Sequence, residues 1–130
     1  MIDFRESLFL EFFSYYIKKE KKVEDINTNQ ASLNKNQNLR YQQLLSTTLE
    51  NIDICILYIT EKSIKWKFER IGSVEKICLI LGVSELIMGL TKKDIVVSEW
   101  VKLTDKHSSS EGAKFVNGLL ENIYKEFNNE

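Results

Sequence analysis

Hydrophobic residues recur every three to four positions along most of the chain, and the first such stripe lies close to its start. Its members are spaced four apart: Phe4, Leu8, Phe12 and Tyr16. This spacing predicts an amphipathic helix with a wide apolar face, which we place within residues 1–22. Asp3 is suited to cap its beginning, and the basic run Lys18–Lys22 suits its end, where the helix dipole favours positive charge.

Residues 23–38 are rich in Asn and Gln and show little periodicity, which is typical of a polar linker that can hold one short helix. A second long stripe follows: Tyr41, Leu45, Leu49, Ile52, Ile56 and Ile59. This stripe predicts a second long helix. We expect this helix and all later ones to lie within residues 39–130. The segment KSIKWKFER, residues 62–70, is expected to form a further helical piece that ends near Gly72. We interpret its basic residues as the solvated side of that piece, and contact with nucleic acid is the alternative.

The most apolar part of the chain begins after Ser73. Ile77–Val83 is an uninterrupted apolar run if Gly82 is included, so it has no polar face to turn toward water. A helix that is apolar on every side is expected at the centre of the fold, in contact with several neighbours. Gly82 in its middle fits a close crossing with another helix.

Two more amphipathic helices are predicted after this central one. Residues 92–107 carry apolar positions at helical spacing, and Ser108 with Glu111 forms the Ser-x-x-Glu pattern of a capping box. The last helix follows, although Asn117 and Gly118 lie inside it and Gly costs about 1 kcal/mol relative to Ala in a helix interior. We interpret Gly118 as a point where two helices approach closely, and Asn117 as a polar tie beside that crossing.

These patterns together predict an all-α fold. No segment alternates with a period of two over a useful length, and the chain of 130 residues contains no proline, which would interrupt long helices. We expect one domain, residues 1–130, with five to seven helices around a common core.

Composition and charge narrow the range of functions. The formal net charge is −1, so a surface for RNA or DNA would have to be a local patch. Cys55 and Cys78 lie in apolar stretches, which favours buried free thiols in a reducing compartment over a disulfide. There is no metal-ligand spacing, nucleophile elbow or phosphate-binding glycine loop, so we expect no metal, cofactor or enzymatic activity. Without a signal peptide or a membrane span, a cytoplasmic protein is expected.

Three stretches of the second half carry a family resemblance: SVEKICLILGVSEL, EWVKL and KFVNGLLENI. In order and spacing they resemble the NusB family, with its VEK motif before an apolar run to Glu-Leu, its INEAVELAK-like helix and its KFVNGVLD-like helix. The middle block is the least similar and keeps Val97, Glu99 and Leu103. The resemblance covers Ser73–Glu121, and Arg5-Glu6 ahead of an apolar helix is weakly similar to the family's first helix.

The resemblance implies an all-helical fold of two small subdomains and a role in transcription antitermination on ribosomal RNA operons. Family members bind single-stranded boxA RNA together with the ribosomal protein NusE, and the complex then joins NusA, NusG and RNA polymerase. Both monomers and homodimers occur in the family. A family arm rich in arginine, which contacts RNA phosphates, has no counterpart in the residues before Arg5, so weaker RNA binding is expected.

The resemblance also nominates RNA-contacting residues. In the last helix it implies Lys114 near a phosphate and Phe115 near a base, and Phe115 is equally well interpreted as a core residue. In the first helix Arg5 could contact a phosphate or be solvated, and Phe13 stands where the family commonly has Tyr, although a core position is favoured for it.

Glu75, Lys76 and His107 complete this set. Glu75 and Lys76 match a family region near RNA and NusE, although a Glu in the first helical turn is also what the helix dipole favours. His107 has no recognisable carboxylate or Cys partner in the sequence, so we interpret it as a helix-end residue, with stacking on RNA as the alternative.

Three functions remain open at this point. The first is an RNA-binding antitermination factor that loads NusE on boxA. The second is a helical protein-interaction module that keeps the NusE-binding surface and has little RNA affinity of its own. The third, least favoured, is a regulatory domain once attached to an RNA-modifying enzyme.

Overall fold

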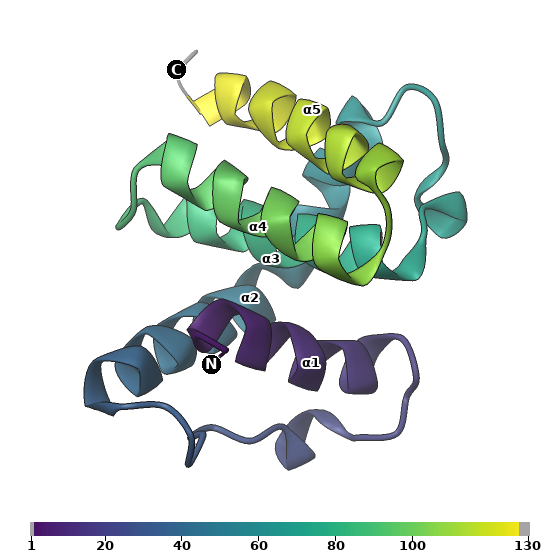
Figure 1. Ribbon diagram of the computed structural model, residues 1–130. Coiled ribbons are helices and arrows are strands. Elements are labelled where there is room, and N and C mark those ends of the chain that lie inside the picture. Colours follow the sequence, from purple (N-terminus) through teal and green to yellow (C-terminus); the bar gives the residue numbers. More distant parts are fainter. Residues whose placement is uncertain (1, 128–130) are drawn as a thin grey trace.

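The chain folds entirely into helices (Figure 1). A computed structural model describes residues 2–127 and contains five α-helices there: α1 Phe4–Tyr16, α2 Lys35–Lys62, α3 Ser73–Met88, α4 Lys93–His107 and α5 Ser110–Phe127. Two short 3-10 helices, η1 Val23–Asp25 and η2 Phe68–Arg70, lie in the connections. No strand occurs in the described residues, so the predicted all-α fold is confirmed.

The long helix α2 joins two parts of the molecule. In Figure 1, α1 lies along the first half of α2, whereas the second half of α2 packs against α3 and α5, and α4 covers those two helices. The backbone of α2 leaves helical geometry at Asn51, with φ −121° and ψ 17°, and its two halves meet there at a kink. The two small subdomains implied by the family resemblance are therefore present.

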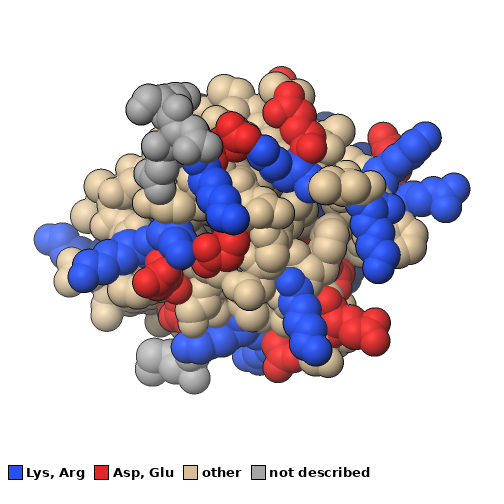
Figure 2. Space-filling view, turned by 90° about the horizontal axis from the view of Figure 1, so that it is seen from above, with Lys and Arg blue, Asp and Glu red and all other residues tan. Residues whose placement is uncertain are grey.

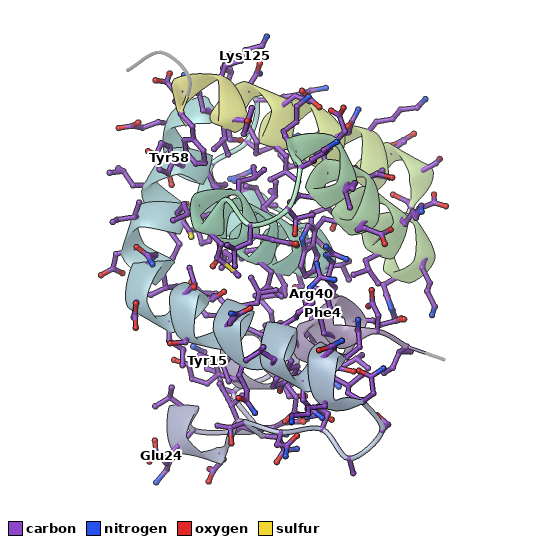
Figure 3. The ribbon with its side chains drawn as sticks, turned by 90° about the vertical axis from the view of Figure 1, so that its left-hand side faces the viewer. Phe4, Tyr15, Glu24, Arg40, Tyr58 and Lys125 are labelled. Atoms are coloured by element: carbon purple, nitrogen blue, oxygen red, sulfur yellow. The ribbon has the colours of Figure 1, made fainter. Side chains whose placement is uncertain are left out.

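Polar contacts at the ends of α1 and α2 hold the smaller part together. The backbone N–H of Phe4 donates to Oε1 of Gln37 at 2.9 Å. The Arg40 guanidinium lies 4.4 Å from the centre of the Phe4 ring, and Figure 3 shows the two side chains facing each other. A cation over an aromatic face is attracted by the electron-rich ring, so this contact adds to the apolar packing between α1 and α2.

The central helix is α3, as its apolar run predicts. All residues from Ile77 to Leu86 are buried. A Cβ added to Gly82 would lie 3.1 Å from Cδ1 of Leu120 and 3.4 Å from Cδ1 of Trp100, so Gly82 permits the predicted close crossing of helices. The helix ends at Gly89, whose φ of 69° suits a residue without a Cβ.

The first helix begins as predicted and ends earlier than predicted. Asp3 caps α1, because its Oδ1 accepts a hydrogen bond from the backbone N–H of Glu6 at 3.0 Å. The prediction that Lys18–Lys22 occupies the end of this helix is wrong, since α1 ends at Tyr16 and no basic residue lies in its last turn. Lys19 has a φ of 57°, which directs the chain away from the helix axis.

Two boundaries between the first helix and α3 also differ from prediction. The polar linker ends at Asn34, whose Oδ1 caps α2 by accepting from the N–H of Gln37 at 2.9 Å, so α2 begins before residue 39. The helical segment predicted within residues 62–70 and ending near Gly72 is present only as the short η2, and Lys62 is the last residue of α2. Ser63 Oγ donates to the Trp66 carbonyl oxygen at 2.6 Å, and such a side-chain bond stabilises a turn in place of a helix.

The residue that caps the start of α5 differs from the prediction. The Oγ of Ser109, not of Ser108, accepts a hydrogen bond from the Gly112 N–H at 3.0 Å. The interpretation of Gly118 as a close crossing is also wrong, because Gly118 is exposed and a Cβ there would meet nothing within 4 Å. Asn117 is exposed as well, and it makes no side-chain hydrogen bond among the described residues.

Both cysteines are buried and free, as predicted. Burial raises the pKa of the Cys55 thiol and of the Cys78 thiol to about 12 in each case. Among the helices of residues 2–127, none offers an apolar stretch long enough to cross a bilayer.

Candidate nucleic-acid interface

Six of the seven residues nominated above lie near the end of α1, the beginning of α3, the end of α4 or the beginning of α5, which gather on one side of the molecule (Figure 1). We call the surface that they form the turn face: Phe13, Glu75, Lys76, His107, Lys114 and Phe115. In Figure 1 the ends of α3, α4 and α5 that carry these residues meet on the same side of the molecule. Segments far apart in the chain thus contribute to one surface.

Glu75 joins the beginning of α3 to this turn. Ser108 Oγ donates a hydrogen bond of 2.6 Å to Oε2 of Glu75. A Cβ on Gly112 or on Gly72 would collide with the same carboxylate, so the two glycines leave the space in which it lies. Glu75 is half-buried, and its main role in the free protein is to tie α3 to the α4–α5 turn.

Lys76, the next residue, extends toward η2. Its Nζ lies 4.7 Å from the centre of the Phe68 ring. Lys76 is half-buried and forms no ion pair within the part of the chain that is described. Its charge therefore lies where the turn face meets the connection between α2 and α3.

His107 is the last residue of α4, as predicted, but it does have a carboxylate partner. Its Nε2 lies 2.7 Å from Oε2 of Glu6, a residue 101 positions away. Lys106 Nζ approaches the same oxygen at 2.8 Å. Burial by itself would raise the pKa of Glu6, but the hydrogen bonds from Lys106 and His107 outweigh it and hold that pKa below its ordinary value.

An aromatic row links His107 to Phe13. The imidazole centre lies 4.8 Å from the ring centre of Phe9, and the Phe9 ring lies 5.8 Å from that of Phe13. Phe9 is buried, whereas Phe13 and His107 are half-buried and keep part of each ring accessible. Phe13 therefore packs against the core, as favoured, but part of its ring remains exposed.

Lys114 and Phe115 lie in the first turns of α5. Lys114 is exposed and forms no ion pair with any described residue, so its charge is available to a ligand. Phe115 packs against the hydrophobic core with part of its ring exposed. This position agrees with both interpretations of Phe115, the core residue and the base contact.

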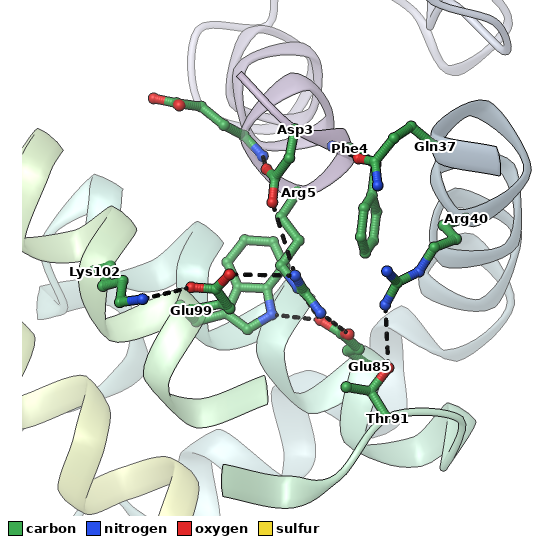
Figure 4. A network of polar contacts seen from close by, with 11 residues as sticks. Asp3, Phe4, Arg5, Gln37, Arg40, Glu85, Thr91, Glu99 and Lys102 are labelled. Atoms are coloured by element: carbon green, nitrogen blue, oxygen red, sulfur yellow. Dashed lines mark hydrogen bonds and ion pairs between the residues drawn. The ribbon is translucent and has the colours of Figure 1, made fainter. Parts of the chain in front are cut away.

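Arg5 lies apart from the turn face, in a buried network (Figure 4). Its Nε and Nη2 donate to the two carboxylate oxygens of Glu85 at 2.8 and 2.7 Å. Trp100 Nε1 donates to Oε1 of the same carboxylate at 2.9 Å. Arg5 is only 4% exposed, which disagrees with both interpretations of it, the phosphate contact and the solvated side chain.

Burial by itself would lower the pKa of Arg5, but the hydrogen bonds and charge of Glu85 outweigh burial and raise it. The guanidinium is therefore a permanently charged internal tie between α1 and α3. Sequence reasoning missed this pair, and the available signal was weak: Glu85 follows the central apolar run, and Arg5 is one of three charged residues within residues 4–16.

A comparison with protein families matches residues 4–125 to the model described as the NusB family. Transcription antitermination protein NusB of Exiguobacterium sp. (strain ATCC BAA-1283 / AT1b) is 34% identical over 87 residues, which cover 66% of this chain and 68% of that protein. Transcription antitermination protein NusB of Fervidobacterium nodosum is 32% identical over 125 residues, which cover 95% of this chain and 80% of that protein. The match to the Nitratiruptor sp. protein, 36% identical, covers 66% of this chain and less than two thirds of that protein, namely 62%.

Solved structures agree with this result. A structure of T. maritima NusB is similar with a TM-score of 0.83 over 95% of this chain and 89% of that one, and at 21% identity it shows the fold alone. A crystal structure of antitermination factors NusB and NusE in complex with dsRNA is similar with a TM-score of 0.76. Its matching chain is 27% identical, over 94% of this chain and 93% of that one.

Proposed function

The chain belongs to the NusB family, and on this premise we propose that it is a transcription antitermination factor that binds RNA together with the ribosomal protein NusE. The observation that carries the proposal is the likeness, over nearly the whole chain, to a family member solved with NusE and RNA. The role is one of binding, and no catalytic step is assigned to it.

The finer proposal concerns the RNA and its destination. We expect boxA-like single-stranded RNA from the leaders of ribosomal RNA operons, and a complex that joins NusA, NusG and RNA polymerase in the cytoplasm. Specific recognition of RNA usually targets unpaired bases, which stack on aromatic side chains while cations contact the backbone. The turn face offers both kinds of group, in the exposed Lys114 and the partly exposed rings of Phe115 and His107.

A second function, a protein-interaction module with little RNA affinity, is favoured by one observation. Arg5 is held by Glu85 inside the fold and is not available to phosphate. Each phosphate contact that is lost reduces both the affinity for RNA and its salt dependence.

One titration separates the two functions. Labelled boxA RNA is titrated with the protein, with and without purified NusE, at two salt concentrations. The antitermination factor predicts RNA binding that strengthens with NusE and weakens with salt, because cationic side chains displace counterions from the phosphates. Formation of the protein pair without any gain in RNA affinity would identify the interaction module.

A further inference from the structure

The connection between α2 and α3 presents large apolar side chains to solvent. We call residues Ser63–Arg70 the aromatic-basic loop. Ile64 is 97% exposed and Trp66 is 46% exposed, although tryptophan has the largest side chain and the most apolar area to bury. Exposed aromatic groups beside polar ones often mark a binding surface.

The same segment lies in a basic region of a chain with net charge −1. Residues 62–76 contain five basic and two acidic side chains, which leaves a local charge of +3. Lys62 pairs with Glu126, but Lys65, Lys67 and Arg70 are exposed and form no ion pair among residues 2–127. Figure 2 shows basic side chains gathered at its right-hand edge, the side on which η2 lies in Figure 1.

The loop is held in shape, and it is continuous with the turn face. Ser63 Oγ bonds the Trp66 carbonyl oxygen, and the Arg70 N–H donates to the Lys67 carbonyl oxygen at 2.9 Å inside η2. Lys76, a member of the turn face, contacts the Phe68 ring of the loop. A ligand that lies along the turn face can therefore continue across the loop past the contact between Lys76 and Phe68.

We propose that the aromatic-basic loop extends the RNA site of the turn face. Trp66 stacks on an unpaired base, and Lys65, Lys67 and Arg70 contact neighbouring phosphates. This inference rests on the proposed function and adds a second contact region to it. A groove of cations with an interleaved aromatic ring is the usual means by which proteins hold single-stranded nucleic acid.

Tryptophan fluorescence tests the stacking directly, because the chain has two tryptophans and Trp100 is fully buried. The probe is boxA RNA with flanking unpaired nucleotides, added to the protein with NusE present. We expect RNA to quench the emission of Trp66. Trp66→Phe should lose the quenching and keep the affinity, whereas Trp66→Ala should weaken RNA binding roughly tenfold, the usual cost of removing a stacking ring.

The salt dependence tests the cations. For a single strand, log K falls with log salt at a slope of about −0.7 per phosphate contact, so Lys65→Gln/Lys67→Gln should make the slope less negative by about 1.4. Lys22→Gln/Lys35→Gln is the matched control, since both of these lysines are exposed and lie next to η1 and at the start of α2, at the opposite end of the molecule from η2 (Figure 1). The control should leave the slope unchanged.

The outcomes distinguish this inference from the function on which it rests. If the unaltered protein binds RNA and the Trp66→Ala and double lysine variants bind it equally well, the loop is no RNA contact and the proposed function stands. If these variants lose affinity for NusE alone, the loop binds protein and the inference is overturned. If the unaltered protein with NusE binds no RNA, both fail together. Thermal melts by circular dichroism confirm that each variant is folded.

Discussion

Single residues in this protein divide into those that hold the fold and those that are available to a ligand. Arg5 and Glu85 belong to the first group, because each is buried and each occupies the other's hydrogen-bonding groups. Lys114 belongs to the second, because it is exposed and has no ion-pair partner among the described residues. Substitution of Arg5 or Glu85 should therefore affect stability, whereas substitution of Lys114 should affect binding.

Arg5→Met should lower the free energy of unfolding by about 3–5 kcal/mol, since it leaves the Glu85 carboxylate buried without its cationic partner. Urea denaturation measures the change. Arg5→Met/Glu85→Leu should recover only part of the loss: the unpaired charge is gone, but Trp100 Nε1 then loses the Glu85 oxygen that accepts its hydrogen bond. A loss below about 1 kcal/mol in the single variant would show that the pair contributes little.

Lys114→Glu should weaken RNA binding and leave the melting temperature nearly unchanged. The variant replaces a free cation with an anion that repels phosphate, and Lys114 makes no ion pair with a described residue. Fluorescence anisotropy with labelled boxA RNA measures the binding. Lys35→Glu, on an exposed site at the start of α2, is the control and should bind normally. A collapse in stability would instead make Lys114 a packing or salt-bridge residue.

Glu6 should make stability depend on acid pH. Its pKa in the folded protein lies below the ordinary value of 4.5, so its stabilising contribution is present above that value and is lost as pH falls through the lowered pKa. Glu6→Gln should therefore be less stable than the unaltered protein at neutral pH, and the difference should shrink as the solution is acidified below about 4.5. Urea denaturation at a series of pH values tests this, and a difference independent of pH would contradict it.

At the scale of elements, glycines in two helices have opposite surroundings. Gly82 in α3 lies against Leu120 and Trp100, which are both fully buried and have no room to move away. Gly118 in α5 faces open solvent. Helix propensity favours alanine at both positions. Packing should nevertheless make alanine destabilising at Gly82, whereas at Gly118 propensity alone should make it stabilising.

Gly118→Ala should raise the free energy of unfolding by about 0.5–1 kcal/mol, because it removes the backbone entropy of a glycine in a helix without adding any contact. Gly82→Ala should lower it, because overfilling a close-packed core costs about 1–3 kcal/mol, more than the propensity gain. Denaturant titration of the two variants side by side measures both changes. If both variants gain stability, the close crossing at Gly82 has been overestimated.

At the scale of the whole molecule, α2 is the one described helix that belongs to both parts, and polar contacts of α1 with α3 and α4 join those parts further. Arg5 reaches Glu85 on α3, and Glu6 reaches His107 on α4. Cys55 in α2 and Cys78 in α3 lie in the larger part and are completely buried. Their accessibility consequently reports how far that part opens in solution.

Both thiols should resist modification by a disulfide reagent at mildly alkaline pH while the protein is folded. Burial raises their pKa values to about 12, and the thiolate is the reactive form. Absorbance measurements should show two reactive thiols only after guanidinium chloride is added, because the chain contains two cysteines. Rapid labelling of one thiol in the native protein would reveal that part of the core opens locally.

The sequence by itself determined the helices, the all-α class and the central place of α3. These features depend on periodicity within a few turns, and a run such as Ile77–Val83 can be shielded from water only at the centre of the fold. The family resemblance nominated seven residues; Arg5 is buried, and the role of the other six in RNA binding stays a prediction.

Tertiary structure alone decided which polar groups meet. The Arg5–Glu85 and Glu6–His107 contacts join residues 80 and 101 positions apart, and local periodicity carries no information about such distant partners. The same limit explains why the interpretation of Gly118 as a helix crossing is wrong. An exposed glycine and a glycine at a helix crossing can have the same local sequence pattern. Only the neighbours supplied by the folded chain distinguish an internal tie from a side chain that is free to bind RNA.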